Sequence, residues 1–300
     1  MKISIVTPSF NQGRYLEATL RSLLDQHYRD LELIVVDGGS TDESLDIIQR
    51  YAPSLSYWES ARDRGQSHAL NKGFAHVHGE IWSWLNSDDL LEPGTLQRVA
   101  EVFTENPEAG VVYGDCVYVG EDGETVIEKF SGEPYSRLRH LAHRFIAQPS
   151  CFFRTSIVPP AVREDLHYCM DYELWLRLAG RGVQFHYVPE VFSRYRLHER
   201  SKSIRALVAM HLEIVEKIYR PILRAGASGE ERSAIAEATA DMVHQLNSLG
   251  ARGPVLRTLL FRLRETRALP DRALVSLGLQ ALLGPGLTSL VQRCKGRLPA

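Results

Sequence analysis

Two adjacent carboxylates, Asp88 and Asp89, end an apolar run that begins at Trp82. Like charges this close raise each other's pKa, so a soluble fold keeps such a pair mainly where water or a cation neutralises it. One interpretation is a turn that starts a helix, because Pro93 and the acid before it are ordinary helix start signals. The other is a hard divalent cation held by carboxylate oxygen, with one side open to a diphosphate.

Other apolar runs of the chain also end on polar residues. In an open α/β sheet, ligands collect outside the carboxyl ends of the strands, so residues that follow different strands should converge. Together they predict a polar, anionic pocket over an apolar sheet. The residues concerned are Thr7, Pro8, Ser9, Asp37, Asp63 and the stretch 86–89.

Two residues in the second half of the chain could complete such a site. Asp171 lies at the start of an amphipathic helix over 168–179, where it is an N-cap carboxylate, a general base facing the pocket, or both. His198 follows the last predicted strand and is either a solvent-facing residue among charged neighbours or a metal ligand. We therefore include Asp171 as candidate base and His198, with Asp88, as candidate metal ligand.

Several common signatures are absent from the sequence. No GxGxxG motif follows the first predicted strand and no GxxxxGK[ST] motif occurs, which excludes a dinucleotide fingerprint and a phosphate-cradling loop. Phosphate must then be handled by a metal. The four cysteines form no CxxC pair, which argues against a zinc site and for a reducing compartment. No signal peptide opens the sequence, so we expect a cytoplasmic protein.

Strands and helices alternate over the first 130 residues, which is typical of an open α/β sheet. The nearly all-apolar run 31–36 is expected of a parallel strand covered on both faces. Ser40 and Glu43 have the spacing of a capping box for a helix over 43–51. Further along we expect a helix over 135–145 and two separate strands over 183–188 and 191–201.

The C-terminal part differs in charge from the rest. From residue 252 onward nine Lys and Arg face two acids, a net charge of +7, whereas the first 251 residues carry −9. We expect domains over 1–204 and 205–300, the second a helical extension whose residues 252–300 meet an anionic membrane surface at the inner face of the plasma membrane. The alternative is a solvated appendage or an oligomer contact. Residues 284–286, Gly-Pro-Gly, break the uncharged stretch 273–292, so a spanning helix is not expected.

With these residues identified, the chain resembles the family 2 glycosyltransferases with a GT-A fold, in particular bacterial enzymes that build cell-surface polysaccharide and O-antigen. The resemblance runs from Lys2 to about Arg205. Its carriers are, in order, ISIVTPSFNQGRYLEATLRSLLDQ, ELIVVDGGSTDES, DRGQSHALNKGF, GEIWSWLNSDDLLEPGTL and YCMDYELWLRLA. It implies a Rossmann-like, mostly parallel open sheet with helices on both faces, followed by the helical extension.

The resemblance also implies roles for matching residues. Asp37 resembles the aspartate that holds the base or ribose of a sugar nucleotide. Asp88 occupies the metal-binding place of the DxD motif, with Mn²⁺ or Mg²⁺ as the cofactor, and Asp171 resembles the general base. The implied donor-binding residues are Thr7, Pro8, Ser9, Asp37, Asp63, Asn71, Asn86, Ser87 and Asp88.

The sequence departs from the family pattern at three positions. Asn86 replaces the first acid of DxD, Met170 replaces one acid of the usual acidic pair, and Gly38 stands where a second aspartate is common. The first two departures each remove a carboxylate, whereas Asp37, Asp88 and Asp171 are all retained.

The implied reaction is metal-dependent, inverting hexosyl transfer from a UDP-, GDP- or dTDP-sugar to a glycan or lipid-linked glycan, with no nucleic-acid partner. A nucleotidyltransferase is one alternative, but it usually has a glycine-rich first loop with Lys or Arg, which residues 7–13 lack. A catalytically weak sugar-nucleotide-binding or scaffold protein is another, made conceivable by Asn86 and Met170.

Overall fold

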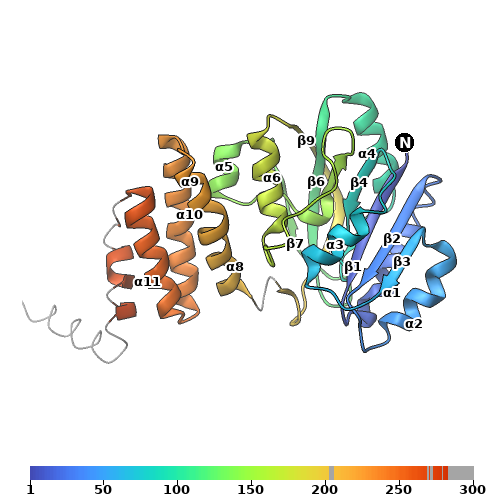
Figure 1. The fold of residues 1–300 in the computed structure, drawn as a ribbon, viewed down its shortest axis with the longest axis horizontal. Helices are drawn as coiled ribbons and strands as arrows, with labels where there is room; N and C mark the ends of the chain where they lie inside the picture. Colours follow the sequence, from blue (N-terminus) through green and yellow to red (C-terminus); the bar gives the residue numbers. More distant parts are fainter. Residues whose placement is uncertain (203–205, 269, 271–272, 279, 283–300) are drawn as a thin grey trace, which may run out of the picture. The chain divides into compact units, whose positions relative to one another are not determined.

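The computed structural model describes residues 1–202, 206–268, 270, 273–278 and 280–282. The chain divides into two compact units. The first comprises Met1–Ser136 and Phe145–Ile204, and the second comprises Arg137–Arg144 and Arg205–Ala300. Figure 1 shows the ribbon coloured along the sequence.

Over the described residues, the first unit contains one nine-stranded sheet in the order β3-β2-β1-β4-β8-β6-β9-β5, with β7 paired to β6 (Figure 1). The strands are β1 (Ile3–Ser9), β2 (Leu31–Asp37), β3 (Tyr57–Ser60), β4 (Ile81–Trp84), β5 (Leu90–Leu91), β6 (Ala109–Val119), β7 (Val126–Phe130), β8 (Cys151–Arg154) and β9 (Gln184–Arg196). β1, β2, β3 and β4 are mutually parallel neighbours, whereas β8 runs antiparallel to both β4 and β6.

The parallel strands end together on one edge of the sheet. Ser9 of β1 lies opposite Asp37 of β2, and Val6 of β1 lies opposite Trp84 of β4. The polar residues that follow these strands are therefore brought to the same edge, as the sequence predicts.

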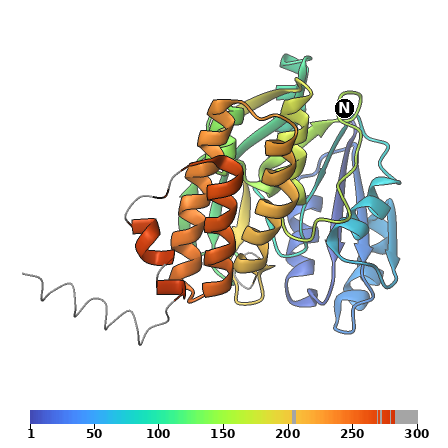
Figure 2. The same cartoon turned by 60° about the vertical axis from the view of Figure 1, so that its left-hand side comes forward.

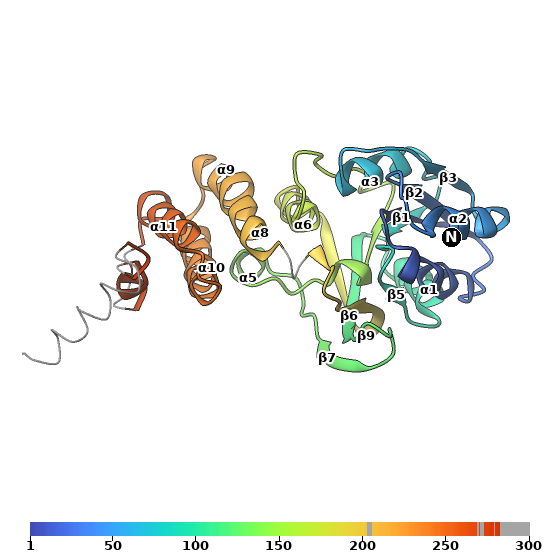
Figure 3. The same ribbon diagram turned by 90° about the horizontal axis from the view of Figure 1, so that it is seen from below.

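Helices cover both faces of this sheet, as Figure 3 shows for α1 and α3 on opposite sides of β1. One apolar core joins α1 (Gly13–Leu24), α2 (Ser44–Tyr51) and α4 (Thr95–Glu105) to one face of the sheet. A second core joins α3 (Gln66–Phe74) and α6 (Met170–Gly180) to the other. Alternate residues of β1 enter alternate cores, Ile5 the first and Val6 the second, because strand side chains point to opposite faces.

The structure corrects two local predictions. Residues 184–196 form one continuous strand rather than two, because the pairing with β6 shifts register around Gly114 and Asp115 and accommodates Pro189 without breaking the strand. The predicted capping box is also wrong. The Ser40 hydroxyl donates to Asp37 Oδ1 at 2.5 Å, and the backbone N–H of Ser44, the first residue of α2, donates to Asp42 Oδ1 at 3.0 Å.

The second unit is helical where it is described. Its elements are α5 (Arg137–Ala142), α8 (Leu207–Glu213), a π-helical stretch Ile214–Tyr219, α9 (Arg220–Arg224), α10 (Gly229–Ser248), α11 (Arg252–Phe261) and a π-helical turn Arg262–Thr266. A capping box of Ser228 and Glu231 starts α10. Figure 2 shows α10 beside α11, and these two helices share an apolar core that includes Val243, Leu246 and Val255.

None of the helices in the described ranges is long and apolar enough to cross a membrane. Most of the uncharged stretch 273–292 lies outside the described residues, which include only 273–278 and 280–282 of it.

Candidate active site

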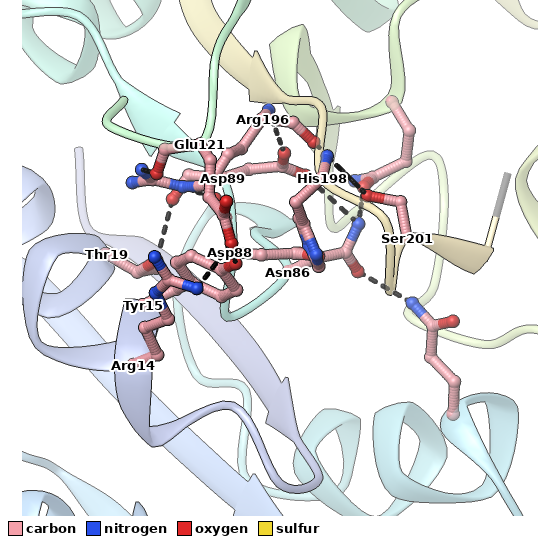
Figure 4. Close-up of polar contacts among 12 residues, drawn as sticks. Arg14, Tyr15, Thr19, Asn86, Asp88, Asp89, Glu121, Arg196, His198 and Ser201 are labelled. Carbon is pink, nitrogen blue, oxygen red and sulfur yellow. Dashed lines mark hydrogen bonds and ion pairs between the residues drawn. The ribbon is translucent and has the colours of Figure 1, made fainter. Parts of the chain in front are cut away.

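The carboxylate of Asp88 meets the imidazole of His198 just beyond the end of β4. Asp88 Oδ2 lies 3.0 Å from His198 Nε2, although the two residues are 110 positions apart in the sequence (Figure 4). The His198 side chain is fully buried and that of Asp88 is 18% exposed. The two residues predicted to bind a metal are thus brought together, with the Asp88 carboxylate on the accessible side.

The neighbouring Asp89 is buried and has a different role. Its Oδ1 accepts from the Arg196 backbone N–H at 3.1 Å, its Oδ2 accepts from Asn86 Nδ2 at 3.2 Å, and its carbonyl accepts from Thr19 Oγ1 at 2.8 Å. Burial, together with the charge of Asp88, raises the pKa of Asp89 well above its usual value. Asp89 therefore fixes the loop, and Asp88 is the member of the pair that a ligand can reach.

Asn86 connects this loop to two other segments. Its Nδ2 donates to Asp89 Oδ2 and to Gln148 Oε1 at 3.1 Å, while its Oδ1 accepts from Gln66 Nε2 at 2.6 Å. Ser87, next in the chain, is buried. A carboxylate at position 86 could not donate to Asp89 and Gln148, so the amide suits this network where the usual acid would not.

At the ends of β1 and β2, hydroxyl groups lie buried beside a fully bonded carboxylate. Thr7 Oγ1 and Ser9 Oγ have no hydrogen-bond partner among the described residues, and Pro8 between them is buried. The buried Asp37 accepts from the backbone N–H groups of Gly39 and Ser40 at 3.0 and 2.8 Å. The carboxylate of Asp37 thus shapes its own turn, while the two hydroxyls retain unused hydrogen-bonding capacity.

Asp63 reaches the end of β2 from the loop before α3. Its Oδ1 accepts from the Gly65 N–H at 2.7 Å. A Cβ atom at Gly38 would lie 2.8 Å from Asp63 Oδ2 and 3.2 Å from the Phe10 ring, so the aspartate that is common at this position would require the Asp63 side chain to move. Phe10 itself is 61% exposed beside this turn.

Asn71 is engaged away from the strand ends. Its Nδ2 donates to the Val162 carbonyl at 2.9 Å and its Oδ1 accepts from the Val162 N–H at 3.0 Å. The predicted donor contact of Asn71 remains a prediction, but in this structure its amide holds the segment before α6 against α3.

Asp171 is the second residue of α6, in its first turn, and is not the N-cap, which is Cys169. Its Oδ1 accepts from the Tyr172 N–H at 2.7 Å. Burial raises the pKa of the Cys151 thiol, and the nearby Asp171 carboxylate adds to the shift. Cys151 lies beside β4, because its carbonyl accepts from Ser83 Oγ of β4 at 2.6 Å. The charge of Asp171 thus acts on a residue next to β4.

Comparison with known proteins decides the family. The model of "glycosyl transferase family 2" matches residues 4–158, more than half of the 300 residues. The chain belongs to glycosyl transferase family 2.

Curated proteins that are named as glycosyltransferases match parts of this chain of different length. An uncharacterized glycosyltransferase of Nostoc sp. (strain PCC 7120) is 38% identical over 41% of this chain and 39% of its own length. A PGL/p-HBAD biosynthesis glycosyltransferase of Mycobacterium bovis is 40% identical over 38% of this chain and 46% of its own. An uncharacterized glycosyltransferase of Rickettsia typhi is 26% identical over 74% of this chain and 71% of its own. The match thus spans less than half of the first two relatives.

Solved structures of glycosyltransferases share the fold. S. aureus TarS 1–349 in complex with UDP superposes with a TM-score of 0.63 at 18% identity, over 95% of this chain and 92% of that one. Mannosyltransferase PcManGT from Pyrobaculum calidifontis, in complex with GDP-Man and Mn²⁺, gives a TM-score of 0.61 at 20% identity, over 96% and 83%. The predicted α/β GT-A fold with a helical C-terminal part is confirmed.

Two side chains of this glycosyltransferase, those of Asp88 and His198, are suitable ligands for the predicted cation. Carboxylate oxygen binds both Mg²⁺ and Mn²⁺, and of these two an imidazole nitrogen suits Mn²⁺ better, because Mg²⁺ takes oxygen ligands. Among the residues that the structure describes, no group of three or more His, Cys, Asp or Glu side chains converges. Asp88 and His198 therefore fit a cation that takes its other ligands from phosphate or water, and they do not form a closed structural site.

Residues that sequence analysis missed surround this pair. Arg196 donates through Nε to the Asp88 carbonyl at 2.8 Å, besides its N–H bond to Asp89, and its guanidinium lies over the Tyr15 ring. Tyr15 is not among the predicted site residues, and Arg196 was predicted only as part of the strand over 191–201. The Arg-x-His spacing next to a strand end is the one sequence signal that could have indicated Arg196.

Proposed function

We propose that this family 2 glycosyltransferase moves a sugar from a nucleoside-diphosphate sugar to an acceptor hydroxyl, with inversion at the anomeric carbon. The observation that carries the proposal is the contact between Asp88 and His198 beyond the end of β4. A carboxylate and an imidazole from distant parts of the chain meet there, at the sheet edge where α/β enzymes bind their ligands.

The donor nucleoside would lie against the ends of β1 and β2. The Thr7 and Ser9 hydroxyls can bond to it, and the exposed Phe10 ring beside Asp63 offers a surface for base stacking. The fold neighbours TarS and PcManGT are complexes with UDP, UDP-GlcNAc and GDP-Man. These complexes support a UDP-, GDP- or dTDP-sugar as the donor class here.

Asp88 and His198 would hold the cation, Mn²⁺ or Mg²⁺, beside the diphosphate. When bound, such a cation neutralises charge on the departing diphosphate without a proton donor. Asp89 and Asn86 keep the loop that carries Asp88 in place through their mutual hydrogen bond. The exposed side of Asp88 then faces the ligand.

Asp171 would deprotonate the acceptor hydroxyl. A single displacement with one general base gives inversion, and the oxocarbenium-like transition state benefits from removal of the acceptor proton. Asp171 lies in the first turn of α6, a helix that packs on the sheet, so its carboxylate is carried by a rigid element. The acceptor we propose is a glycan or lipid-linked glycan of a cell-surface polysaccharide.

The test is a donor panel on the full chain. UDP-, GDP- and dTDP-sugars are incubated with MnCl₂, MgCl₂ or EDTA, and release of nucleoside diphosphate is measured. We expect release from at least one donor, dependent on the divalent cation and lost in Asp88→Ala. Donor binding without release under all conditions would favour a sugar-nucleotide-binding protein, and pyrophosphate release from nucleoside triphosphates would favour a nucleotidyltransferase.

We also propose that the second unit meets an anionic membrane surface through α11. One side of α11 and of the turn after it exposes Arg257, Leu260, Leu263 and Arg264, with Leu260 49% and Leu263 41% exposed. Cations interleaved with apolar side chains on one helix face suit an interface of anionic lipid, where each cation contributes roughly 1 kcal/mol.

Vesicle sedimentation tests this surface. The full chain should bind phosphatidylcholine vesicles only when phosphatidylglycerol is included, and the double variant Arg257→Gln/Arg264→Gln should bind roughly thirtyfold more weakly. The matched control, Glu237→Gln/Asp241→Asn, neutralises exposed acids of α10 and should bind at least as well as the parent. Equal retention on both kinds of vesicle, or none, would contradict the proposal.

A further inference from the structure

The His198 imidazole has a hydrogen bond on one side only. Its Nε2 lies 3.0 Å from Asp88 Oδ2, whereas its buried Nδ1 has no hydrogen-bond partner among the described residues. A metal-ligating histidine usually donates its second N–H to a carboxylate, carbonyl or water, which fixes the orientation of the ring. In this site that orientation must come from another contact.

Tyr15 of α1 provides that contact. Its ring centroid lies 4.5 Å from that of His198, with an interplanar angle of 42° (Figure 4). The Arg196 guanidinium lies 5.1 Å from the same Tyr15 ring. The tyrosine is itself buried. His198 therefore packs against a ring that Arg196 also contacts.

The tip of the β6–β7 hairpin, residues 120–123, fixes Tyr15. The Tyr15 hydroxyl donates to Glu121 Oε1 at 2.6 Å, and Arg14 Nη1 donates to the same oxygen at 2.6 Å. The Glu121 carbonyl accepts from Arg196 Nη1 at 2.7 Å. Glu121 therefore holds Tyr15 and Arg14 through its carboxylate and Arg196 through its carbonyl (Figure 4).

The tip has its own internal bonds. Asp122 Oδ1 accepts from the N–H groups of Glu124 and Thr125 at 3.0 and 2.9 Å. Gly123 has a φ of +78°, and a Cβ there would lie 2.6 Å from Arg196 Nη1. Glycine is therefore needed both for the turn and for the passage of the arginine. The turn presents Glu121 in a defined position.

We propose that Tyr15 is a positioning residue for His198 and that Glu121 locks it, so that the hairpin tip sets the affinity of the site for its cation. The inference rests on the proposed function, which assigns the cation to Asp88 and His198. A purely stabilising role would be weak, because the Glu121 side chain is 47% exposed and exposed ion pairs contribute little to folding.

The test measures Mn²⁺ affinity of the full chain by electron paramagnetic resonance, in the presence of UDP or GDP. Tyr15→Leu removes the ring contact and should weaken Mn²⁺ binding about 10- to 100-fold, the range for losing an outer partner of a metal ligand. Tyr15→Phe keeps the ring and should lose about fivefold or less. Nucleotide binding in EDTA should stay at the parent value in both variants.

Tyr28→Leu is the matched control. Tyr28 also donates its hydroxyl, to the Met1 carbonyl at 2.5 Å, but at the opposite edge of the sheet, so its loss should leave Mn²⁺ affinity unchanged. If Tyr15→Leu does not fold by circular dichroism, Glu121→Ala replaces it, with an expected loss of about fivefold.

The outcomes separate the two proposals. The inference is overturned if His198→Ala binds Mn²⁺ more weakly than the parent while Tyr15→Leu binds it as tightly. Where Tyr15→Leu does not fold, the same comparison is made with Glu121→Ala. Parent-like affinity in both His198→Ala and Asp88→Ala would instead overturn the cation site of the proposed function. An equal loss in Tyr28→Leu and Tyr15→Leu would also refute the positioning role, because general destabilisation would then explain both.

Discussion

At the amino edge of the parallel strands the buried acid Glu32 lies among hydrogen-bond donors, whereas at the carboxyl edge the buried acid Asp89 lies beside a second carboxylate. Burial alone would raise the pKa of Glu32, but the bonds that it accepts outweigh burial and lower the pKa to about 2. Its partners are Ser4 Oγ at 2.5 Å, the His78 N–H at 2.8 Å, Lys2 Nζ at 2.9 Å and the His78 ring at 3.2 Å.

At the carboxyl edge, the bonds that Asp89 accepts from Asn86 and from the Arg196 N–H do not outweigh burial and the charge of Asp88. Asp89 has a raised pKa, and the Thr7 and Ser9 hydroxyls and one ring nitrogen of His198 have no partner among the described residues. An edge that satisfies its polar groups internally contributes to stability, and the unpaired polar groups of the carboxyl edge accord with the ligand site proposed there. Substitutions at the two edges should therefore differ in what they change.

The largest effect should come from Asp171→Asn. If Asp171 is the general base, turnover falls by about 10² to 10⁴, while donor binding stays close to the parent value. Steady-state kinetics and donor titration check this. Glu173→Gln is the control, because Glu173 lies in the same helix turn but pairs with Arg177 at 3.1 Å. Parent-like turnover in Asp171→Asn would exclude the base role.

At the opposite edge, Glu32→Gln should change stability. A pKa lowered from 4.5 to about 2 corresponds to about 3 kcal/mol of unfolding free energy at pH 7. Because the unfolded state binds the proton more readily, this contribution is complete above about pH 5 and is lost as the pH falls toward 2. Urea unfolding of parent and variant between pH 7 and 3 should converge at low pH, and a constant difference would contradict the prediction.

Asp88→Ala tests the role of the carboxyl edge in cation-dependent ligand binding. We expect sugar-nucleotide binding to weaken about 10- to 100-fold in MnCl₂ and to remain near the parent value in EDTA, because the lost carboxylate acts through the cation. Calorimetric titration under both conditions measures the effect. If sugar-nucleotide binding weakens equally in EDTA, Asp88 does not act through a metal ion.

The smallest effect should come from Asn86→Asp, which restores the usual family acid. The new carboxylate would face Asp89 Oδ2 and Gln148 Oε1, to which Asn86 now donates at 3.2 and 3.1 Å. We expect a loss of about 1 to 2 kcal/mol in unfolding free energy and no gain in Mn²⁺ affinity. Tighter Mn²⁺ binding without destabilisation would show that this edge tolerates a third acid.

The sequence predicts the sheet well where apolar runs end on polar residues. β1, β2 and β4 are such runs, and their ends meet on one edge. β5 was missed because two residues, Leu90 and Leu91, carry no periodicity, and they become a strand only by pairing with β9. The continuity of β9 across Pro189 depends on a register shift against β6, which local sequence does not encode.

The site was predictable in part for a similar reason. Asp88 and His198 have side chains whose chemistry indicates metal binding wherever they lie, and the fold brings them together. Tyr15 and Glu121 carry no such signal. An aromatic residue at helical spacing indicates a core position, and an acid in a turn indicates solvent, so their contact emerges only when the β6–β7 hairpin meets α1.

The segment 155–169 is attached to α3 through its main chain. Ser67 Oγ donates to the Leu166 carbonyl at 2.5 Å, and Asn71 bonds both main-chain groups of Val162. Asn71 Nδ2 also donates to Glu164 Oε1 at 3.3 Å, and Val158, Val162 and Leu166 are buried in the second core. Polar anchors and apolar contacts together therefore fix the path of the segment. The segment leads into Asp171, and a chimaera that carries this loop from a relative would be seated by Ser67 and Asn71 if it keeps apolar residues at positions 158, 162 and 166.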